Sequence, residues 1–340
     1  MRKVSVLALV CDIGLANMIV PLLQELERLG HTVTLLAEDS GEAKNHLEVP
    51  FSVVDTEVSL RAHVVRHWPD IIMTGFSALR FLETILDRMA KESGTPLVHL
   101  EDYWAVHTRG SDEPGLYITI DEFSERLLKK IHPRVPIVVA GLVGVSLVTP
   151  SPGLISSFDA IRQRTGGKVL VYPDGGPMCE RALPLIVESV LRTNTHVTVV
   201  PKFHPAFKTL VCPLGGTWDQ WCHSQLGPLR ACHRVVDFVD STDEVIEAAD
   251  GVASSFSTTL IRAACAGKLA LTLLDEVSRE IFKKSTQLDE TPLIRDGRFP
   301  VLTESQSLDR YFAVTQPVYV IKPFDPSIAA RAVLALARSK

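Results

Sequence analysis

Short apolar runs alternate with amphipathic segments along nearly the whole chain, and this alternation constrains the fold more than any other feature. Lys3–Val10 and Leu97–Leu100 have the length and composition of buried strands. Asn17–Leu29 repeats apolar residues every three or four positions, as a helix packed on a sheet does. Strands that are apolar throughout are typical of a parallel sheet covered by helices on both faces. The pattern therefore predicts an α/β protein.

The alternation occurs twice, in two arrays of similar size. The first ends near Ala140 and the second starts at Lys168, with the Pro/Gly-rich stretch TPSPG at 149–153 between them. A chain of 340 residues suits two domains, because one domain usually holds roughly 100–200 residues. We therefore predict two Rossmann-like βαβ domains that face each other across a cleft. Their expected limits are 1–148, 149–167 for a linker and helix, 168–325, and 326–340 for a C-terminal helix. Within the second array we expect 206–232 to be irregular and 234–238 to be a strand.

Charge and cysteine content exclude other classes of protein. The net charge is −5 and no block of five like charges occurs, which argues against a nucleic-acid groove or an anionic membrane surface. The six cysteines are scattered without a C-x-x-C pair, which favours reduced thiols over a disulfide framework or a metal site. No apolar run is long enough to span a bilayer. We expect a cytoplasmic protein without a bound metal or a transmembrane segment.

Two strand ends in the second array carry residues suited to an anionic ligand. After the strand that ends at Tyr172, Gly175 and Gly176 would let backbone N–H groups approach a phosphate closely, although a tight turn explains them equally well. The next strand leads into Lys202, His204 and Pro205, where a cation and an imidazole suit a phosphate or a ribose.

A third strand end has a dense group of hydroxyl side chains. The segment GVASSFSTT at 251–259 leaves a buried strand and enters a helix. One hydroxyl can cap the helix, and the others lie where free N–H groups and the positive end of the helix dipole attract anions. We therefore expect phosphate binding by four residues of this turn: Ser254, Ser255, Ser257 and Thr258.

At this turn the sequence resembles a known group. ADGVASSFSTTLIRAACAGKLALTL at 249–273 is similar to the nucleotide-binding strand–helix–strand of GT-B-fold glycosyltransferases, and KFHP at 202–205 is similar to the His-Pro motif of bacterial sialyltransferases, capsule polysaccharide transferases and glycerophosphotransferases. The resemblance covers 202–274 and implies a GT-B fold in which the second domain binds a nucleotide-sugar donor. It also implies that His204 and the Ser-rich turn contact the donor's phosphates. The implied function is transfer of a sugar to a sugar or glycan acceptor in polysaccharide or glycoconjugate synthesis.

One departure bears on the stereochemistry of transfer. Retaining GT-B enzymes with an E-x7-E motif have a glutamate on the helix after this turn, whereas this chain has Arg262 there. An inverting enzyme, which needs a base for the acceptor hydroxyl, is therefore favoured. Asp12, Glu101 and Asp102 follow strands of the first array, and adjacent carboxylates can raise one another's pKa toward that of a base.

Two alternatives stay open. His99 and Glu101 resemble the H-x-E motif of UDP-N-acetylglucosamine 2-epimerases, but the strand end at 73–77 lacks the aspartate of that family. Arg262 also suits a GT-B-like protein that binds a nucleotide without catalysis. No P-loop, G-x-G-x-x-G or HExxH motif occurs, so no cofactor beyond the donor substrate is expected.

Overall fold

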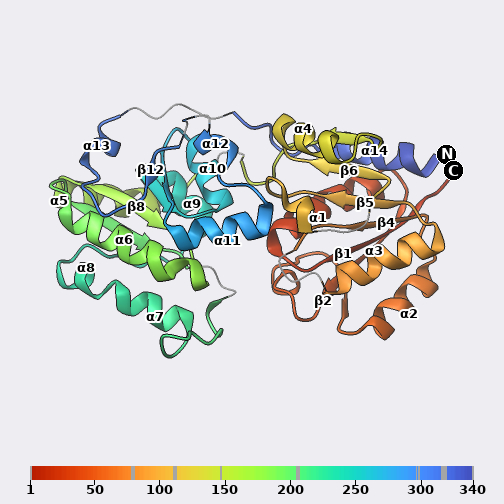
Figure 1. Ribbon diagram of the computed structural model, residues 1–340, viewed down its shortest axis with the longest axis horizontal. Coiled ribbons are helices and arrows are strands. Elements are labelled where there is room, and N and C mark those ends of the chain that lie inside the picture. Colours follow the sequence, from red (N-terminus) through yellow and green to blue (C-terminus); the bar gives the residue numbers. More distant parts are fainter. Residues whose placement is uncertain are drawn as a thin grey trace. The chain divides into compact units, whose positions relative to one another are not determined.

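The chain forms two compact units, Met1–Val143 with Ile321–Lys340, and Gly144–Val320. They are seen in a computed structural model (Figure 1) that describes residues 2–77, 81–109, 113–145, 148–203, 207–295, 297, 299–314 and 320–338. The chain passes from the first unit to the second and returns, so the first unit contains both ends of the sequence. No helix in these ranges is long and apolar enough to cross a membrane.

Unit 1 is built on a seven-stranded sheet in which all neighbouring strands are parallel, in the order β3-β2-β1-β4-β5-β6-β7. Its central strands are buried along their whole length, as the continuous apolar runs predicted. The strands are β1 (Ser5–Val10), β2 (Thr32–Glu38), β3 (Ser52–Val54), β4 (Ile71–Thr74), β5 (Leu97–Leu100), β6 (Leu116–Thr119) and β7 (Ile137–Val139).

Helices cover both faces of this sheet. The chain moves from β1 to β2 in one direction and later returns to build β4 to β7 on the other side of β1, so right-handed crossovers place α1 on one face and the later helices α2 and α3 on the other. On one face α1 contacts α14, while α2 and α3 contact each other on the other. The helices are α1 (Ile13–Arg28), α2 (Glu57–His67), α3 (Phe81–Ser93), α4 (Glu122–Ile131) and α14 (Pro326–Arg338), with short 3-10 turns η1 (Ala43–Asn45) and η2 (Val106–Arg109).

The outgoing and returning segments of the chain pair with each other at the edge of unit 1. Leu142 N donates to Lys322 O at 3.0 Å, and Phe324 N donates to Leu142 O at 3.0 Å. Gly141 has a φ of +96°, and a Cβ there would lie 2.4 Å from the carbonyl oxygen of Pro323. Only glycine therefore fits between the paired segments at this position.

Unit 2 has a five-stranded parallel sheet in the order β12-β11-β10-β8-β9. On one face α9 contacts α5 and α10, and on the other α6 contacts α7, α8 and α11. The strands are β8 (Lys168–Tyr172), β9 (Val197–Pro201), β10 (Gly251–Ser254), β11 (Leu269–Leu273) and β12 (Val301–Leu302). The helices are α5 (Pro152–Thr165), α6 (Cys179–Arg192), α7 (Trp218–Gln225), α8 (Gly227–Ala231), α9 (Thr242–Ala248), α10 (Thr258–Cys265), α11 (Glu276–Thr286), α12 (Pro292–Arg295) and α13 (Asp309–Phe312), with the 3-10 turn η3 (Gly176–Met178).

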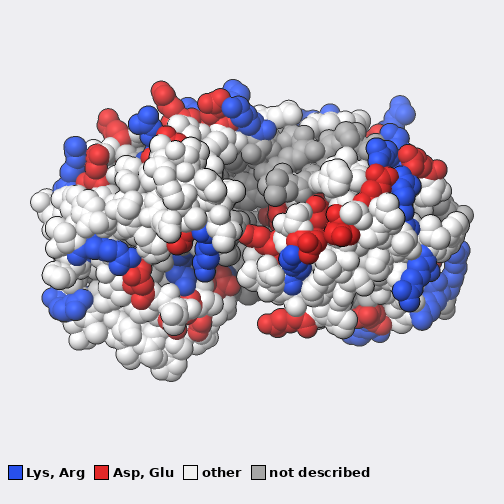
Figure 2. Space-filling model, turned by 90° about the horizontal axis from the view of Figure 1, so that it is seen from below, with Lys and Arg blue, Asp and Glu red and all other residues white. Residues whose placement is uncertain are grey.

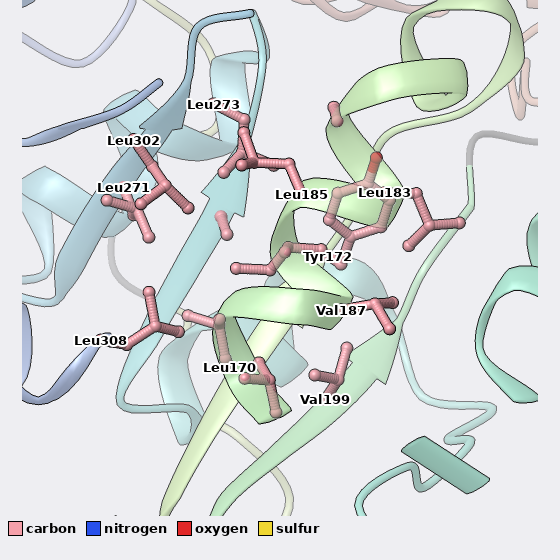
Figure 3. Packing of buried hydrophobic residues seen from close by; sticks show 14 of the residues in the cluster. Leu170, Tyr172, Leu183, Leu185, Val187, Val199, Leu271, Leu273, Leu302 and Leu308 are labelled. Atoms are coloured by element: carbon pink, nitrogen blue, oxygen red, sulfur yellow. The ribbon is translucent and has the colours of Figure 1, made fainter. Parts of the chain in front are cut away.

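The core of unit 2 lies between this sheet and α6. Figure 3 shows Leu183, Leu185 and Val187 of α6 packed near Leu170, Val199 and Leu271 of three strands. The side chain of Tyr172 is fully buried in the same cluster. The apolar face of α6 therefore anchors the carboxyl end of β8, where the first of the predicted ligand loops begins.

These two parallel sheets confirm the predicted α/β class, but two local predictions were wrong. The segment 206–232 is not irregular throughout, because it contains α7 and α8. Thr217 and Gln220 form a capping box at the start of α7, which is a sequence signal for a helix. The expected strand at 234–238 is reduced to a single bridge between Val199 and Val235.

Candidate functional site

A buried carboxylate joins two strand ends of unit 2. Asp174, just after β8, is 4% exposed and accepts a hydrogen bond from Ser255 N at 2.7 Å. Its other oxygen accepts a hydrogen bond from the Ser254 hydroxyl at the end of β10. Because β8 and β10 are neighbours in the sheet, residues about eighty positions apart meet at its carboxyl edge. Ser254 and Ser255 are themselves fully buried, so the structure directs them toward Asp174 rather than toward solvent.

The network continues from the serine turn into the next loop. The Ser278 hydroxyl of α11 donates to Asp275 Oδ2 at 2.6 Å, and its oxygen lies 3.3 Å from the Ser255 hydroxyl. Asp275 caps α11 by accepting from the N–H groups of Val277 and Ser278. The exits of β8, β10 and β11 are therefore linked by one chain of hydrogen bonds. Sequence reasoning missed Asp174 and Ser278, although Asp174 directly precedes the glycine pair.

Burial changes the pKa of the Asp174 carboxyl group. Removal from water raises the pKa of this carboxyl, whereas the hydrogen bonds from Ser254 and Ser255 lower it, and burial is the larger effect. The negative charge of Asp275 raises it further.

The N-terminus of α10 is more open than the turn that precedes it. Ser257 is the N-cap, and its hydroxyl accepts a hydrogen bond from Thr259 N at 3.2 Å. Ser257 is half-buried and Thr258 is exposed. Of the four predicted hydroxyl residues, the structure thus places two inside the network and two at the accessible start of the helix.

Lys202 and the residues after it also follow a strand end. The Lys202 ammonium donates to the carbonyl oxygens of Asp240 at 2.6 Å and Phe238 at 3.2 Å. Burial lowers the pKa of this lysine. Lys202 therefore holds the loop at 238–240 against the end of β9. His204 and Pro205 lie outside the described residues.

The glycine pair after β8 borders an aromatic crevice. Gly176 has a φ of +66°, and a Cβ there would lie 2.4 Å from the Phe207 ring, whereas Gly175 is extended. The crevice is too narrow to admit a water molecule, so it is not a ligand pocket. Gly176 thus serves the packing of this loop against Phe207. The crevice is lined by Gly175, Gly176, Phe203, Phe207, Trp218, Asp219 and Cys222.

In unit 1, Glu101 is enclosed by hydrogen-bond partners. It is fully buried, and Oε1 accepts from the backbone N–H of His107 at 3.1 Å and lies 2.5 Å from Nδ1 of the same residue. Oε2 accepts from the Thr119 hydroxyl at 2.9 Å. Both oxygens are therefore engaged inside the unit, and His107 is a third residue that sequence reasoning missed.

His99, the other member of the H-x-E pattern, is buried in a separate cluster. Its Nε2 lies 3.2 Å from Asp87 Oδ1, and the same oxygen accepts from the Thr74 hydroxyl at 2.6 Å. All three side chains are buried. His99 and Glu101 thus contact different partners.

Asp12 and Asp102 lie at the start of α1. Asp12 is the N-cap residue, and Asp102 Oδ2 lies so close to Gly14 that a Cβ there would be 2.1 Å from it. Both aspartates are half-buried. Of the three predicted catalytic carboxylates, Asp102 therefore lies beside the first turn of α1, the turn that follows Asp12. Glu101 lies inside the unit.

Arg262 has a partner of its own. It is 9% exposed and forms an ion pair with Asp243 of α9, and its guanidinium also lies 3.6 Å from the Cβ position of Gly144. Burial lowers the pKa of Arg262 to about 10. The arginine that occupies the place of the retaining enzymes' acid thus joins α10 to α9.

Within the part of the chain that the structure describes, no three His, Cys, Asp or Glu side chains are grouped so as to hold a metal ion. Figure 2 shows Lys and Arg side chains interspersed with Asp and Glu on one face of the molecule.

Comparison with solved structures identifies the fold. A UDP-N-acetylglucosamine 2-epimerase from Neisseria meningitidis, solved with UDP-GlcNAc, aligns with a TM-score of 0.64 at 12% identity, over 99% of this chain and 100% of the other. HepE of Anabaena, solved with UDP-glucose, aligns with a TM-score of 0.59 at 16% identity, over 99% and 95%. A glycosyltransferase from Rickettsia africae aligns with a TM-score of 0.56 at 12% identity, over 100% and 93%. No protein-family model matches the chain, and no curated protein matches its sequence. The chain has the fold of GT-B glycosyltransferases and UDP-N-acetylglucosamine 2-epimerases.

Proposed function

We propose that this chain is an inverting glycosyltransferase that takes a sugar from a nucleotide-sugar donor bound by unit 2. The observation that carries the proposal is the pair of hydrogen bonds that Asp174 accepts from the Ser254 hydroxyl and the Ser255 N–H. They fix the serine turn from inside and leave the N-terminus of α10 accessible. The N–H groups and dipole of such a helix end attract a phosphate. The donor class is supported by the fold, which HepE and the Neisseria epimerase share while holding UDP-glucose and UDP-GlcNAc.

The proposed roles of the residues in unit 2 follow from whether each side chain is buried or accessible. Ser257 and Thr258 contact a donor phosphate, while Ser254 and Ser255 hold the turn. Lys202 supports the loop at 238–240. Gly175 and Gly176 follow β8 in the sequence and His204 and Pro205 follow β9, and in this proposal these four residues contact the rest of the nucleotide. Negative charge that develops on the leaving phosphate is stabilised by the helix end.

Unit 1 supplies the base and the site for a sugar or glycan acceptor. The base is Asp102, with Asp12 as the other candidate, and it takes the proton of the acceptor hydroxyl. The hydroxyl oxygen of the acceptor then attacks the anomeric carbon of the donor sugar, and the nucleotide leaves. Glu101 is a positioning residue in this proposal, because His107 and Thr119 occupy both of its oxygens. In this proposal the enzyme acts in the synthesis of a polysaccharide or glycoconjugate, without a bound metal ion.

Epimerisation of a UDP-sugar is the second candidate function. The His99/Glu101 spacing and the fold of the Neisseria enzyme favour it. The enclosure of Glu101 and the absence of an aspartate from the described strand end at 73–77 favour transfer instead.

A nucleotide screen followed by a turnover assay tests the proposal. UDP, CMP, CDP, GDP, TDP and ADP are each added to the protein, and one of them should raise the melting temperature, since a ligand at 100 times its Kd stabilises a fold by about 2.7 kcal/mol. The matching nucleotide sugar is then incubated alone and with sugar acceptors. Acceptor-dependent release of the nucleotide supports transfer, whereas a new sugar formed without acceptor supports epimerisation. Binding without either product supports a non-catalytic protein, and no melting shift contradicts the whole proposal.

A further inference from the structure

Asp174 presents an electrostatic conflict with the anion site proposed above. Its carboxyl group is buried and lies one hydrogen bond away from the serine turn, whose chain continues directly into α10. An ionised carboxylate at this depth repels a phosphate at the same helix end, and the repulsion is strong where water is excluded. A phosphate must therefore either bind despite this repulsion or bind when the Asp174 carboxyl is protonated and neutral.

Among the described residues, the groups in contact with Asp174 do not neutralise its charge. From β10 it meets the Ser254 hydroxyl and the Ser255 N–H, which are uncharged donors. Tyr172 of β8 and Cys179 of α6 lie close enough for the charge of Asp174 to raise the pKa of each. The charge that acts on it most is that of Asp275, which is also negative.

The hydrogen bonds show where a proton could be held. Oδ2 accepts from the Ser255 N–H at 2.7 Å, so this oxygen must keep a lone pair. Oδ1 meets the Ser254 hydroxyl, which can either donate or accept. A proton on Oδ1 therefore reverses the direction of this hydrogen bond, so that the carboxyl donates to the Ser254 oxygen. The contacts with Ser254 and Ser255 are both kept.

We propose that Asp174 is the positioning residue of the donor site and that it takes up one proton from solvent when the nucleotide sugar binds. The carboxyl holds the serine turn in both protonation states, but only the neutral form leaves the start of α10 free of a nearby negative charge. This inference rests on the proposed function, since it assumes a phosphate at that helix end. Donor affinity should therefore fall as the pH rises, and the fall should depend on Asp174.

The test compares wild type with Asp174→Asn and Asp174→Ala by calorimetric titration between about pH 5.5 and about pH 8.5. Asn keeps both contacts in the neutral arrangement, because its oxygen accepts from Ser255 and its NH₂ donates to Ser254. The probe is UDP-glucose, or the nucleotide sugar selected by the screen, because its phosphates, unlike the terminal phosphate of UDP, do not titrate in this range. We expect the wild-type Kd to rise by up to about tenfold per pH unit above the Asp174 pKa, and the Kd of Asp174→Asn to stay nearly constant. Asp174→Ala should bind weakly at every pH. Asp237→Asn, an exposed aspartate paired with Arg230, is the matched control and should follow wild type.

The outcomes separate this inference from the proposed function. Equal pH profiles for wild type and Asp174→Asn would overturn proton uptake, and wild-type affinity in Asp174→Ala would overturn positioning. If wild type binds no nucleotide sugar at any pH, the proposed function and proton uptake both fail. Amide hydrogen exchange at Ser255 then still decides the positioning role. We expect protection in wild type and in Asp174→Asn and fast exchange in Asp174→Ala, and protection in all three would contradict it.

Discussion

Glu101 Oε1 lies 2.5 Å from Nδ1 of His107, and both side chains are buried in unit 1. The same carboxylate accepts the His107 backbone N–H and the Thr119 hydroxyl, so it ties the end of β5 to η2 and to β6. A carboxylate with this many internal partners is suited to holding the fold in place.

Replacement of Glu101 should therefore act mainly on stability. Glu101→Ala leaves the donors of His107 and Thr119 unpaired inside the protein, and we expect a loss of about 3 kcal/mol in the free energy of unfolding. Glu101→Gln keeps an acceptor for His107 and should cost about 1 kcal/mol. Urea unfolding, with the exposed Glu92→Ala as a control, measures both. A Glu101→Ala protein as stable as this control would show that the network contributes nothing.

Asp102 should act on turnover instead. We expect Asp102→Asn to lower kcat by about 10²- to 10⁴-fold, as removal of a general base does, without a change in donor affinity. Gly14→Ala should lower kcat as well, because the new Cβ would lie 2.1 Å from Asp102 Oδ2 and displace the carboxylate. The exposed Asp39→Asn is the control. If Asp102→Asn kept full activity and Asp12→Asn lost activity, the base would be Asp12 and not Asp102.

Two glycines of unit 2 offer a matched pair. Gly176→Ala puts a Cβ against Phe207 at a positive φ, and we expect it to destabilise the protein by about 1–3 kcal/mol. Gly153→Ala, in the first turn of α5, meets no atom within 4 Å and should be neutral or stabilising by up to about 1 kcal/mol. Urea unfolding of both variants checks this, and equal effects would contradict the role given to Gly176.

Asp309 should make part of the stability depend on pH. Hydrogen bonds from the Thr195 side chain and from Thr195 N at 3.0 Å, with those from Ser307 and from Asn194 N at 3.1 Å, hold the pKa of the Asp309 carboxyl well below its usual range. The ionised form is therefore favoured by folding, so its contribution is complete above the ordinary aspartate pKa of about 3.9 and is lost as the pH falls further. We expect Asp309→Asn to unfold at lower urea than wild type at neutral pH, with the difference narrowing toward about pH 3. Glu304→Gln, exposed in the same loop, is the control, and a difference that does not change with pH would refute the explanation.

The sheet architecture could be predicted from sequence because its signal is local. Buried parallel strands such as β1 and β11 are apolar at all but one position, and that pattern is visible without knowledge of their neighbours. Helix α7 was missed because it carries few apolar residues, although its capping box at Thr217 and Gln220 was present in the sequence.

The candidate site was only partly predictable, because its contacts depend on which strands are neighbours. The pairing of Asp174 with Ser254 requires β8 to lie beside β10, and no pattern around Asp174 reveals that adjacency. Glu101 and Asp102 illustrate a second limit. Successive residues at a strand end point in different directions, but the sequence does not tell which of the two is covered by a later segment.

The position of α14 has a consequence for biosynthesis. This helix packs on α1 and buries Ala329, Ala330, Val333 and Leu334 against unit 1. Residues 144–320, which form the whole of unit 2, are translated before it. During translation, the sequence of unit 2 is therefore complete before that of unit 1. Unit 1, although its synthesis starts first, keeps an apolar face uncovered until residues 326–338 emerge from the ribosome. The usual order, in which the N-terminal domain is completed first, is therefore reversed in this chain.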